Sequence, residues 1–168
     1  MPISDYLRGL RAKVGHDLLL MPSVTVMVYD EQGRILLVKD ADTQVWVAPG
    51  GSIDPHELPA DAAVREMWEE TGLLVTPTRI IGVYSGSDFQ VNYSNGDAVC
   101  YVMTMFECRI VEGEMQPDGI ETLEIGYFSE ADLATLKLPA WAKIVLPDAF
   151  RAKGQAYFQA AKWKPLAD

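Results

Sequence analysis

The chain has 168 residues, of which 49% are hydrophobic and 23% charged, and this composition predicts one globular domain over residues 1–168 rather than a disordered chain. The formal net charge of −10 argues against a protein that binds nucleic acid or an anionic membrane, because both need a basic surface, and it implies that a protein acting on phosphates must recruit cations. The sequence has no run of 18 apolar residues and no apolar signal-peptide core, which predicts a cytoplasmic protein.

The N-terminal segment is predicted to form a helix followed by two strands. Ser4 can cap a short helix of about residues 4–14, in which apolar residues recur at helical spacing. Residues 17–30 then have the composition of a strand, and Pro22 indicates an edge or a break in it because proline cannot donate a ladder hydrogen bond. A turn at the sequence DEQG leads into a returning strand over residues 34–40.

A central helix is predicted between two clear boundary signals. A short strand over residues 45–48 leads into a Pro-Gly-Gly sequence and a loop; the helix then begins at Pro59, in a first-turn position, and ends at Gly72, which can adopt the left-handed conformation. The apolar stripe that we expect to be buried comprises Ala60, Ala63, Val64 and Met67. The acidic residues of this helix point away from the stripe, so we expect them to line a rim where the helix meets the rest of the fold.

The second half of the chain is predicted to consist mainly of strands, over residues 73–86, 89–93, 98–110 and 123–128. Asn95-Gly96 is a strong hairpin signal between the second and third of them. The strand 98–110 is apolar on both faces, as a central strand covered on both sides would be. Its two cysteines, Cys100 and Cys108, would lie about 27 Å apart along a regular strand, so we expect reduced core residues rather than a disulfide.

Two helical segments are expected near the C-terminal end. Ser129 can cap a short helix over residues 130–136, and residues 140–163 have a helical pattern that is interrupted at Pro147 and Gly154. Apolar residues of the N-terminal helix and those around Trp141 and Trp163 have two interpretations, the surface of a homodimer or ordinary packing within one copy. The sequence therefore leaves the oligomeric state open.

Three glutamates, Glu66, Glu69 and Glu70, are near neighbours on the predicted central helix because they are spaced at i, i+3 and i+4. At a separation of about 6 Å and an effective dielectric constant of about 20, each pair of carboxylates repels by roughly 3 kcal/mol. Clustered carboxylates are suitable ligands for Mg²⁺ or Mn²⁺, and a bound divalent cation turns the repulsion into attraction. The alternative interpretation is an acidic surface that water screens.

The residues around these glutamates follow a fixed spacing in the sequence GSIDPHELPADAAVREMWEETGL. In order, the main specified positions are Gly51, Glu57, Arg65, Glu66, Glu69, Glu70, Gly72 and Leu73. This pattern resembles the Nudix box, the signature of the Nudix hydrolases, and every specified position is filled. The match favours a cation site over a screened acidic surface. The resemblance implies an α/β fold of the Nudix type, an α/β/α sandwich with a mixed β-sheet between helices.

The resemblance also implies roles for individual residues. The metal ligands of the family correspond to Glu66, Glu69 and Glu70 and to the backbone carbonyl of Gly50, with Mg²⁺ as the cation and Mn²⁺ as a substitute. A salt bridge between Glu57 and Arg65 is expected to orient the ligand helix, and Arg65 can also pair with Glu69. The general base stays open between Glu69, Glu70, Glu121 and Glu124; we rank Glu121 above Glu124 because a loop can bring it to the metal.

The activity implied by the resemblance is hydrolysis of a nucleoside diphosphate linked to another moiety, by attack of a metal-activated water on phosphorus. The substrate candidates are an NDP-sugar-like compound and a (deoxy)nucleoside triphosphate. A catalytically silent nucleotide-binding regulator with the same fold is the alternative, although such a protein would be free to lose carboxylates that this chain keeps. The aromatic residues Trp46, Phe89, Tyr93 and Tyr101 are candidates for stacking on a base, yet aromatic residues in strands more often belong to the core.

Two positions depart from the family pattern. His56 stands where the family commonly has glycine, so a turn that favours positive φ must tolerate a side chain. Leu58 stands where Ser or Thr usually caps the helix, which costs about 1 kcal/mol of local stability. Neither residue corresponds to a metal ligand, so we interpret both as local tuning.

Overall fold

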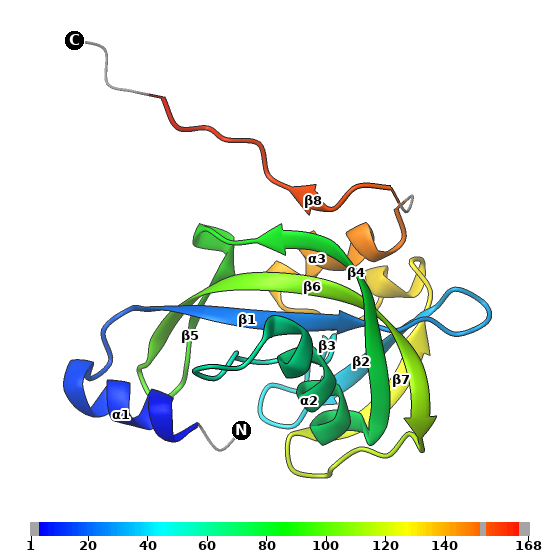
Figure 1. The fold of residues 1–168 in the computed structure, drawn as a ribbon, viewed down its shortest axis with the longest axis horizontal. Helices are drawn as coiled ribbons and strands as arrows, with labels where there is room; N and C mark the ends of the chain where they lie inside the picture. Colours follow the sequence, from blue (N-terminus) through cyan, green and yellow to red (C-terminus); the bar gives the residue numbers. More distant parts are fainter. Residues whose placement is uncertain (1–3, 152–153, 165–168) are drawn as a thin grey trace.

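The structure is a computed structural model that describes residues 4–151 and 154–164 (Figure 1). Its helices are α1 (Asp5–Val14), α2 (Pro59–Thr71) and α3 (Ala140–Ala149), with single 3₁₀ turns η1 (Ser87–Phe89) and η2 (Asp132–Ala134). Its strands are β1 (Leu19–Met27), β2 (Ile35–Asp40), β3 (Trp46–Val47), β4 (Leu73–Tyr84), β5 (Gln90–Asn92), β6 (Ala98–Gly113), β7 (Thr122–Phe128) and β8 (Tyr157–Phe158).

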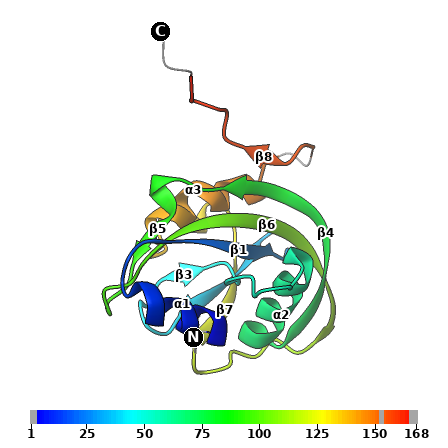
Figure 2. The same cartoon turned by 60° about the vertical axis from the view of Figure 1, so that its left-hand side comes forward.

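The strands form two sheets. The larger sheet has the order β1-β6-β4-β8, with β5 also paired to β6, and the smaller one has the order β3-β2-β7. The larger sheet is mixed, because β1 runs parallel to β6 while β4 runs antiparallel to it. As predicted, the apolar strand β6 lies inside the sheet, and Pro22 lies in the edge strand β1. The long curved strands β4 and β6 wrap over the smaller sheet (Figure 2).

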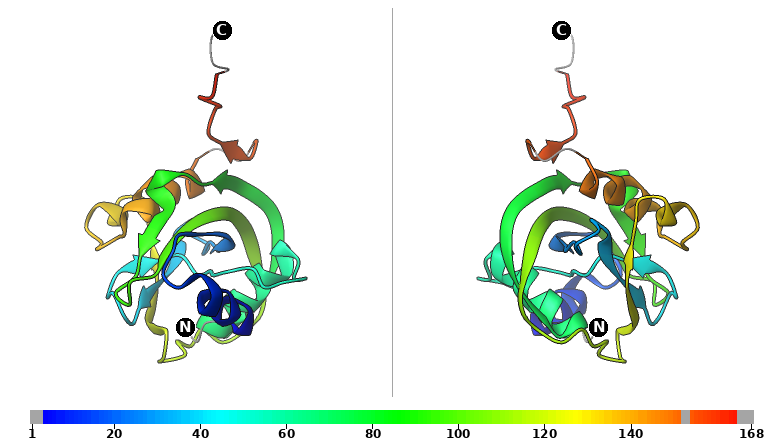
Figure 3. Two further views of the ribbon diagram at one scale, coloured as in Figure 1. Left: turned by 90° about the vertical axis from the view of Figure 1, so that its left-hand side faces the viewer. Right: turned by 90° about the vertical axis from the view of Figure 1, so that its right-hand side faces the viewer.

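Successive residues of β2 alternate between two hydrophobic clusters, one on each side of the strand. Leu36 and Val38 belong to the cluster that contains α2, whereas Ile35 and Leu37 belong to the cluster that contains α3. This alternation follows from the two-residue repeat of a strand that is buried on both faces. Helices α2 and α3 therefore cover opposite sides of the strands (Figure 3), which is the α/β/α sandwich that the sequence predicted.

The N-terminal helix begins at its predicted cap. The Ser4 side chain accepts a hydrogen bond from the backbone N–H of Leu7 at 3.3 Å, and α1 ends before Gly15. None of the ten residues of α1 is buried. The helix is instead tied to the start of β6 by Arg11, whose guanidinium donates to the backbone carbonyl of Ala98 at 2.9 Å and lies 3.5 Å from the Asp97 carboxylate.

The boundaries of α2 agree with the prediction, but its buried face does not. Pro59 is the first helical residue, and Gly72 closes the helix in the left-handed conformation (φ 70°), donating to the Trp68 carbonyl at 2.9 Å. The buried residues are Ala62, Ala63, Glu66, Met67, Glu70 and Thr71. The predicted stripe is thus wrong at Ala60 and Val64, which are only half-buried, and the buried face is rotated toward the glutamates.

The predicted helices near the C-terminal end are shorter than expected. Residues 130–136 contain only the turn η2, because Asp132 bends back to accept hydrogen bonds from the N–H and hydroxyl of Ser129 at 2.8 and 2.7 Å. The helical pattern over 140–163 is correct only as far as Ala149. Beyond it, Tyr157 and Phe158 pair with β4 as a parallel strand, and the described residues up to 164 form no further helix.

The two cysteines are both free, as expected; Cys108 is buried and Cys100 is half-buried. Across residues 4–151 and 154–164, no helix combines the length and the apolar character that a membrane crossing needs.

Candidate active site

Two of the three box glutamates are buried. Glu66 and Glu70 are only 2% and 8% exposed, so these two acids lie inside the fold and not on the rim, where the helix meets the rest of the fold, that was predicted for all three. The loop before α2 makes room for them, because a side-chain carbon at Gly51 would collide with the Glu66 carboxylate. A glycine in the loop and a glutamate in the helix therefore form one packing unit, which a helical repeat alone does not reveal.

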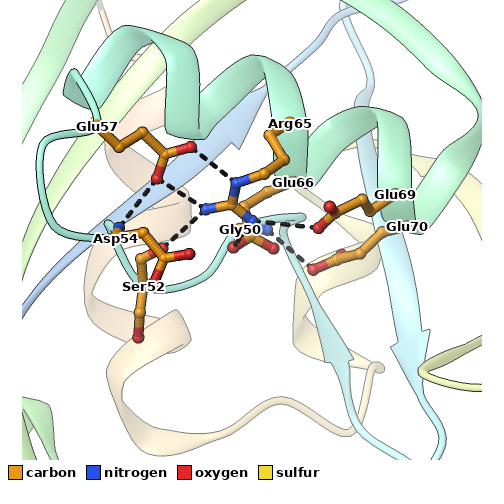
Figure 4. A network of polar contacts seen from close by, with 8 residues as sticks. All are labelled: Gly50, Ser52, Asp54, Glu57, Arg65, Glu66, Glu69 and Glu70. Atoms are coloured by element: carbon orange, nitrogen blue, oxygen red, sulfur yellow. Dashed lines mark hydrogen bonds and ion pairs between the residues drawn. The ribbon is translucent and has the colours of Figure 1, made fainter. Parts of the chain in front are cut away.

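Gly50 lies beside Glu70. Its backbone N–H points to Oε1 of Glu70 at 3.4 Å, while the carbonyls of the residues on either side of it accept hydrogen bonds from β1 at 2.8 and 2.9 Å. The Gly50 N–H therefore points away from β1 and toward the Glu70 carboxylate. The structure thus places Gly50, whose carbonyl is the predicted ligand, next to one of the predicted carboxylate ligands (Figure 4).

Both buried carboxylates are costly to ionise. Burial raises the pKa of Glu66 to about 6, although the hydrogen bond from Arg65 opposes this effect. Burial also raises the pKa of Glu70 well above its usual range, and the charge of Glu66 raises it further. A nearby positive charge would favour the ionised form of both groups.

Arg65 connects the other acids of the site. Its guanidinium donates to both carboxylate oxygens of Glu57 at 2.7 and 2.9 Å, to Glu66 at 2.8 Å, to Glu69 at 3.1 Å and to the backbone carbonyl of Ser52 at 3.0 Å (Figure 4). These hydrogen bonds lower the pKa of Glu57. The predicted pairs of Arg65 with Glu57 and with Glu69 are both present, and they hold α2 against the loop that precedes it.

Glu69 stands apart from the buried pair. Its side chain is 57% exposed and is turned toward Arg65. Within the part of the chain that the structure describes, no three Asp, Glu, His or Cys side chains stand together as a ready set of metal ligands. The arrangement brings Glu66, Glu70 and Gly50 together, whereas Glu69 would have to turn from Arg65 to join them.

The two later acids differ in their surroundings. Glu121 precedes β7 in the loop after β6, and its charge raises the pKa of both Glu66 and Glu70, so it acts on the buried pair. Glu124 lies within β7, is 57% exposed and pairs with Nζ of Lys39 at 2.6 Å. The charge of Glu121 thus reaches the box acids, whereas Glu124 pairs with Lys39 of β2.

Sequence reasoning missed one acid of this loop, Asp118. Its carboxylate accepts hydrogen bonds from the backbone N–H groups of Ile120, Glu121 and Thr122 at 3.0, 3.0 and 2.8 Å. The sequence PDGIE does contain a signal for this role, because Asp before Gly is typical of a turn that the Asp side chain closes.

The aromatic candidates for base stacking are mostly engaged in packing. Phe89 is buried and tilted against Tyr84, and Trp46 packs edge-on against Phe128 with ring centroids 4.7 Å apart. Tyr93 and Tyr101 share a hydrogen bond of 2.6 Å between their hydroxyl groups. The structure therefore singles out none of them as a base-stacking residue.

The two departures from the box are local, as expected. His56 adopts positive φ (71°) in the exposed turn where the family has glycine. Leu58 occupies the N-cap of α2 without a side-chain hydrogen bond to the helix.

A mixed sheet between two helices, with an arginine-anchored acidic helix and a Gly-Gly loop folded over it, defines the architecture of a Nudix domain. Comparison with known proteins leads to the same class: residues 19–149 match the family model of the NUDIX domain. The chain therefore belongs to the Nudix family. The predictions of family, of fold class and of enzyme class, a Nudix pyrophosphohydrolase, are confirmed.

One relative in sequence is a "Putative 8-oxo-dGTP diphosphatase" of Bacillus subtilis. It is 36% identical over 114 residues, which are 68% of this chain and 70% of the relative. The diphosphoinositol polyphosphate phosphohydrolase 2 of Homo sapiens is 35% identical over 60 residues, which are 35% of this chain and only 33% of that protein.

Solved structures agree on the fold. An ADP-ribose pyrophosphatase of Streptococcus suis has a TM-score of 0.60 and 28% identity, and the match covers 80% of this chain and 94% of that one. A UDP-X diphosphatase has a TM-score of 0.66, with coverage of 89% and 70%; at 20% identity it supports the fold alone.

Proposed function

We propose that this protein hydrolyses a diphosphate bond in a nucleotide, with Mg²⁺, or Mn²⁺ as a substitute, bound by Glu66, Glu69 and Glu70 and by the Gly50 carbonyl. The observation that carries the proposal is the buried pair Glu66 and Glu70, which are 2% and 8% exposed. Placing two carboxylates side by side away from water is unfavourable unless a cation joins them.

The residues present fit a divalent cation. Arg65 reaches Glu66 at 2.8 Å, but it divides its donors among several acceptors, and the hydrogen bond from Gly50 to Glu70 is long at 3.4 Å. Carboxylate and backbone carbonyl oxygens are the ligands that Mg²⁺ prefers. When bound, the cation would neutralise charge on the diphosphate and lower the pKa of the attacking water.

The protein's own residues would orient the reaction and accept a proton. Water attacks one phosphorus atom, a new P–O bond forms, the bond to the bridging oxygen breaks, and the water loses a proton to a base. The hydrogen bonds of Arg65 to Glu57 and to the Ser52 carbonyl hold α2 against the loop that contains Gly50 and Gly51, which keeps the proposed ligands of the helix and of the loop together.

Glu121 is the base that we propose. It extends from a loop, and its charge acts on both Glu66 and Glu70. Glu69 lies on α2 and pairs with Arg65, and Glu124 lies within β7 and pairs with Lys39. Glu70 is better suited to hold the cation than to accept the proton, because it is buried and lies beside Gly50.

The favoured substrate class is a (deoxy)nucleoside triphosphate, because the Bacillus subtilis relative is named for 8-oxo-dGTP and its match covers more than two thirds of both chains. An NDP-sugar-like compound is the second candidate, favoured by the named activity of the Streptococcus suis structure. The two differ in their products: a nucleoside monophosphate with pyrophosphate in the first case, and a nucleoside monophosphate with a sugar phosphate in the second.

A screen of nucleotide derivatives would test the proposal. Purified protein is incubated with each compound in Mg²⁺, in Mn²⁺ and in EDTA, and the products are separated by ion-exchange chromatography. We expect turnover of at least one compound with cleavage inside the diphosphate, and loss of turnover in EDTA. Tight nucleotide binding without any turnover would instead favour the silent regulator.

A further inference from the structure

The loop between β6 and β7 is held to its surroundings by backbone hydrogen bonds. The N–H of Gln116 donates to the Thr71 carbonyl at the end of α2, at 2.9 Å, and the N–H of Ala41 donates to the Glu121 carbonyl at 2.8 Å. These contacts fix where the loop lies relative to α2 and to the end of β2. A further backbone hydrogen bond, from the N–H of Gly119 to the Thr122 carbonyl at 3.0 Å, spans the turn between them.

Asp118 closes that turn. Its Oδ1 accepts hydrogen bonds from three consecutive backbone N–H groups, those of residues 120, 121 and 122, at 3.0, 3.0 and 2.8 Å. Oδ2 lies 3.3 Å from the N–H of Glu121 as well. A carboxylate that accepts hydrogen bonds from several N–H groups forms strong, charge-assisted hydrogen bonds and fixes the orientation of the peptide planes that it contacts.

Burial of hydrophobic side chains does not fix the conformation of this turn. Ile120, the residue before Glu121, is 77% exposed, so the side chain that would otherwise anchor the turn lies in solvent. Thr122, the residue after Glu121, is buried at the start of β7. Glu121 therefore sits between an exposed residue and a buried one, and the Asp118 carboxylate makes up for the missing anchor on the exposed side.

We propose that Asp118 is a positioning residue for Glu121, an inference that rests on the proposed function and on Glu121 as its base. Asp118 holds the backbone from which the Glu121 carboxylate extends, and in the proposed role that carboxylate works at the site of Glu66 and Glu70. Without it, the three N–H groups would turn to water, and Glu121 would sample positions too far from the reacting water. Displacing a reacting group by about 1 Å can cost about 100-fold in rate.

Three variants test the role. For Asp118→Ala we expect kcat to fall by about 10- to 100-fold, with KM unchanged within about twofold, because Asp118 contacts the backbone of the loop and its removal displaces the base. Asp118→Asn keeps an oxygen that can accept the N–H groups, so we expect it to retain kcat within about threefold.

Asp30→Ala is the matched control. The Asp30 carboxylate likewise accepts backbone N–H groups, those of Gln32 and Arg34 at 3.0 and 2.9 Å, in the turn between β1 and β2. That turn lies at a different edge of the molecule from the β6–β7 loop (Figure 1). We expect Asp30→Ala to lower the thermal midpoint without lowering kcat.

A double-mutant cycle separates positioning from general loss of structure. If Asp118 acts through Glu121, adding Asp118→Ala to Glu121→Gln leaves the residual kcat of Glu121→Gln unchanged within about twofold. An equal loss in both backgrounds would overturn the proposal, and so would a kcat of Asp118→Ala equal to wild type.

Amide hydrogen exchange tests the positioning role of Asp118 in the absence of substrate. We expect the amides of residues 120–122 to exchange at least about 10-fold faster in Asp118→Ala than in wild type, and at the wild-type rate in Asp30→Ala. Unchanged exchange at these amides would overturn the positioning role.

Failure of this inference can be distinguished from failure of the proposed function. If wild-type protein cleaves no nucleotide, the proposed function fails. Turnover that does not depend on Glu121 overturns only the assignment of the base and of its positioning residue.

Discussion

The acids of helix α2 and of the loop before it form two sets, which differ in how far Arg65 neutralises their charge. Glu57, from the loop before α2, and Glu69 both pair with Arg65, at 2.7 and 3.1 Å; the Glu57 side chain is largely shielded from solvent and the Glu69 side chain is exposed. Glu66 and Glu70 lie on the buried side, where Arg65 reaches only Glu66. In the proposed function, the set that Arg65 neutralises holds the helix in place, and the set that it leaves short of positive charge binds the cation.

The largest expected effect comes from neutralising the buried set. Glu70→Gln should reduce kcat by about 1000-fold, because it removes a charged oxygen from the site where charge develops on the diphosphate. The same change should leave the fold intact or slightly more stable in EDTA, since an amide is cheaper to bury than a carboxylate whose pKa burial has raised. Steady-state kinetics and a thermal melt measure the two effects.

Glu124→Gln is the control for that comparison. Its carboxylate is exposed and paired with Lys39, outside the buried set. We expect its kcat to stay within about threefold of wild type, as is usual for an exposed ion pair. Wild-type kcat in Glu70→Gln, or an equal loss in both variants, would contradict the assignment of the site.

Removing the neutralising arginine should cost stability. Arg65→Ala leaves three carboxylates without their guanidinium partner, two of them shielded from solvent, and we expect the free energy of unfolding to fall by about 2–4 kcal/mol. Urea denaturation at pH 7 measures it. Arg65→Lys keeps the charge but not the two-pronged geometry, so an intermediate loss is expected. Equal stability of all three proteins would show that Arg65 does not hold the helix.

Glu66 should make stability depend on pH in the absence of a divalent cation. Burial raises its pKa from 4.5 to about 6 in the folded protein, so its favourable contribution is fully present below pH 4.5 and is lost as the pH rises through 6. The loss amounts to about 2 kcal/mol. Thermal melts in EDTA between pH 4 and 7 should therefore show a fall that is shallower in Glu66→Gln, where the raised pKa of Glu70 still contributes, and Mg²⁺ should restore stability at pH 7. A Glu66→Gln curve parallel to wild type would contradict the shift.

That the three box glutamates share one helix could be predicted from their fixed spacing. Their burial could not, because it depends on Gly51 lying against Glu66, a contact between a loop and a helix. The same limit applies to the segment after Ala149, whose helical pattern is overridden where Tyr157 stacks on Tyr84 with ring centroids 5.3 Å apart. Local patterns predicted the boundaries of α2 correctly, and the errors lie where a distant contact decides the outcome.

The smallest expected effect concerns the solvent-exposed start of α2. Leu58 is the N-cap, 63% exposed, and makes no side-chain hydrogen bond to the helix. Leu58→Ser supplies an oxygen that can accept a free N–H of the first turn, so we expect about 1 kcal/mol of added stability, with kcat unchanged. Leu58→Ala separates this gain from the loss of the leucine side chain. If Leu58→Ser raised stability and lowered kcat together, the start of α2 would be coupled to the buried acids, and the two sets would not act independently.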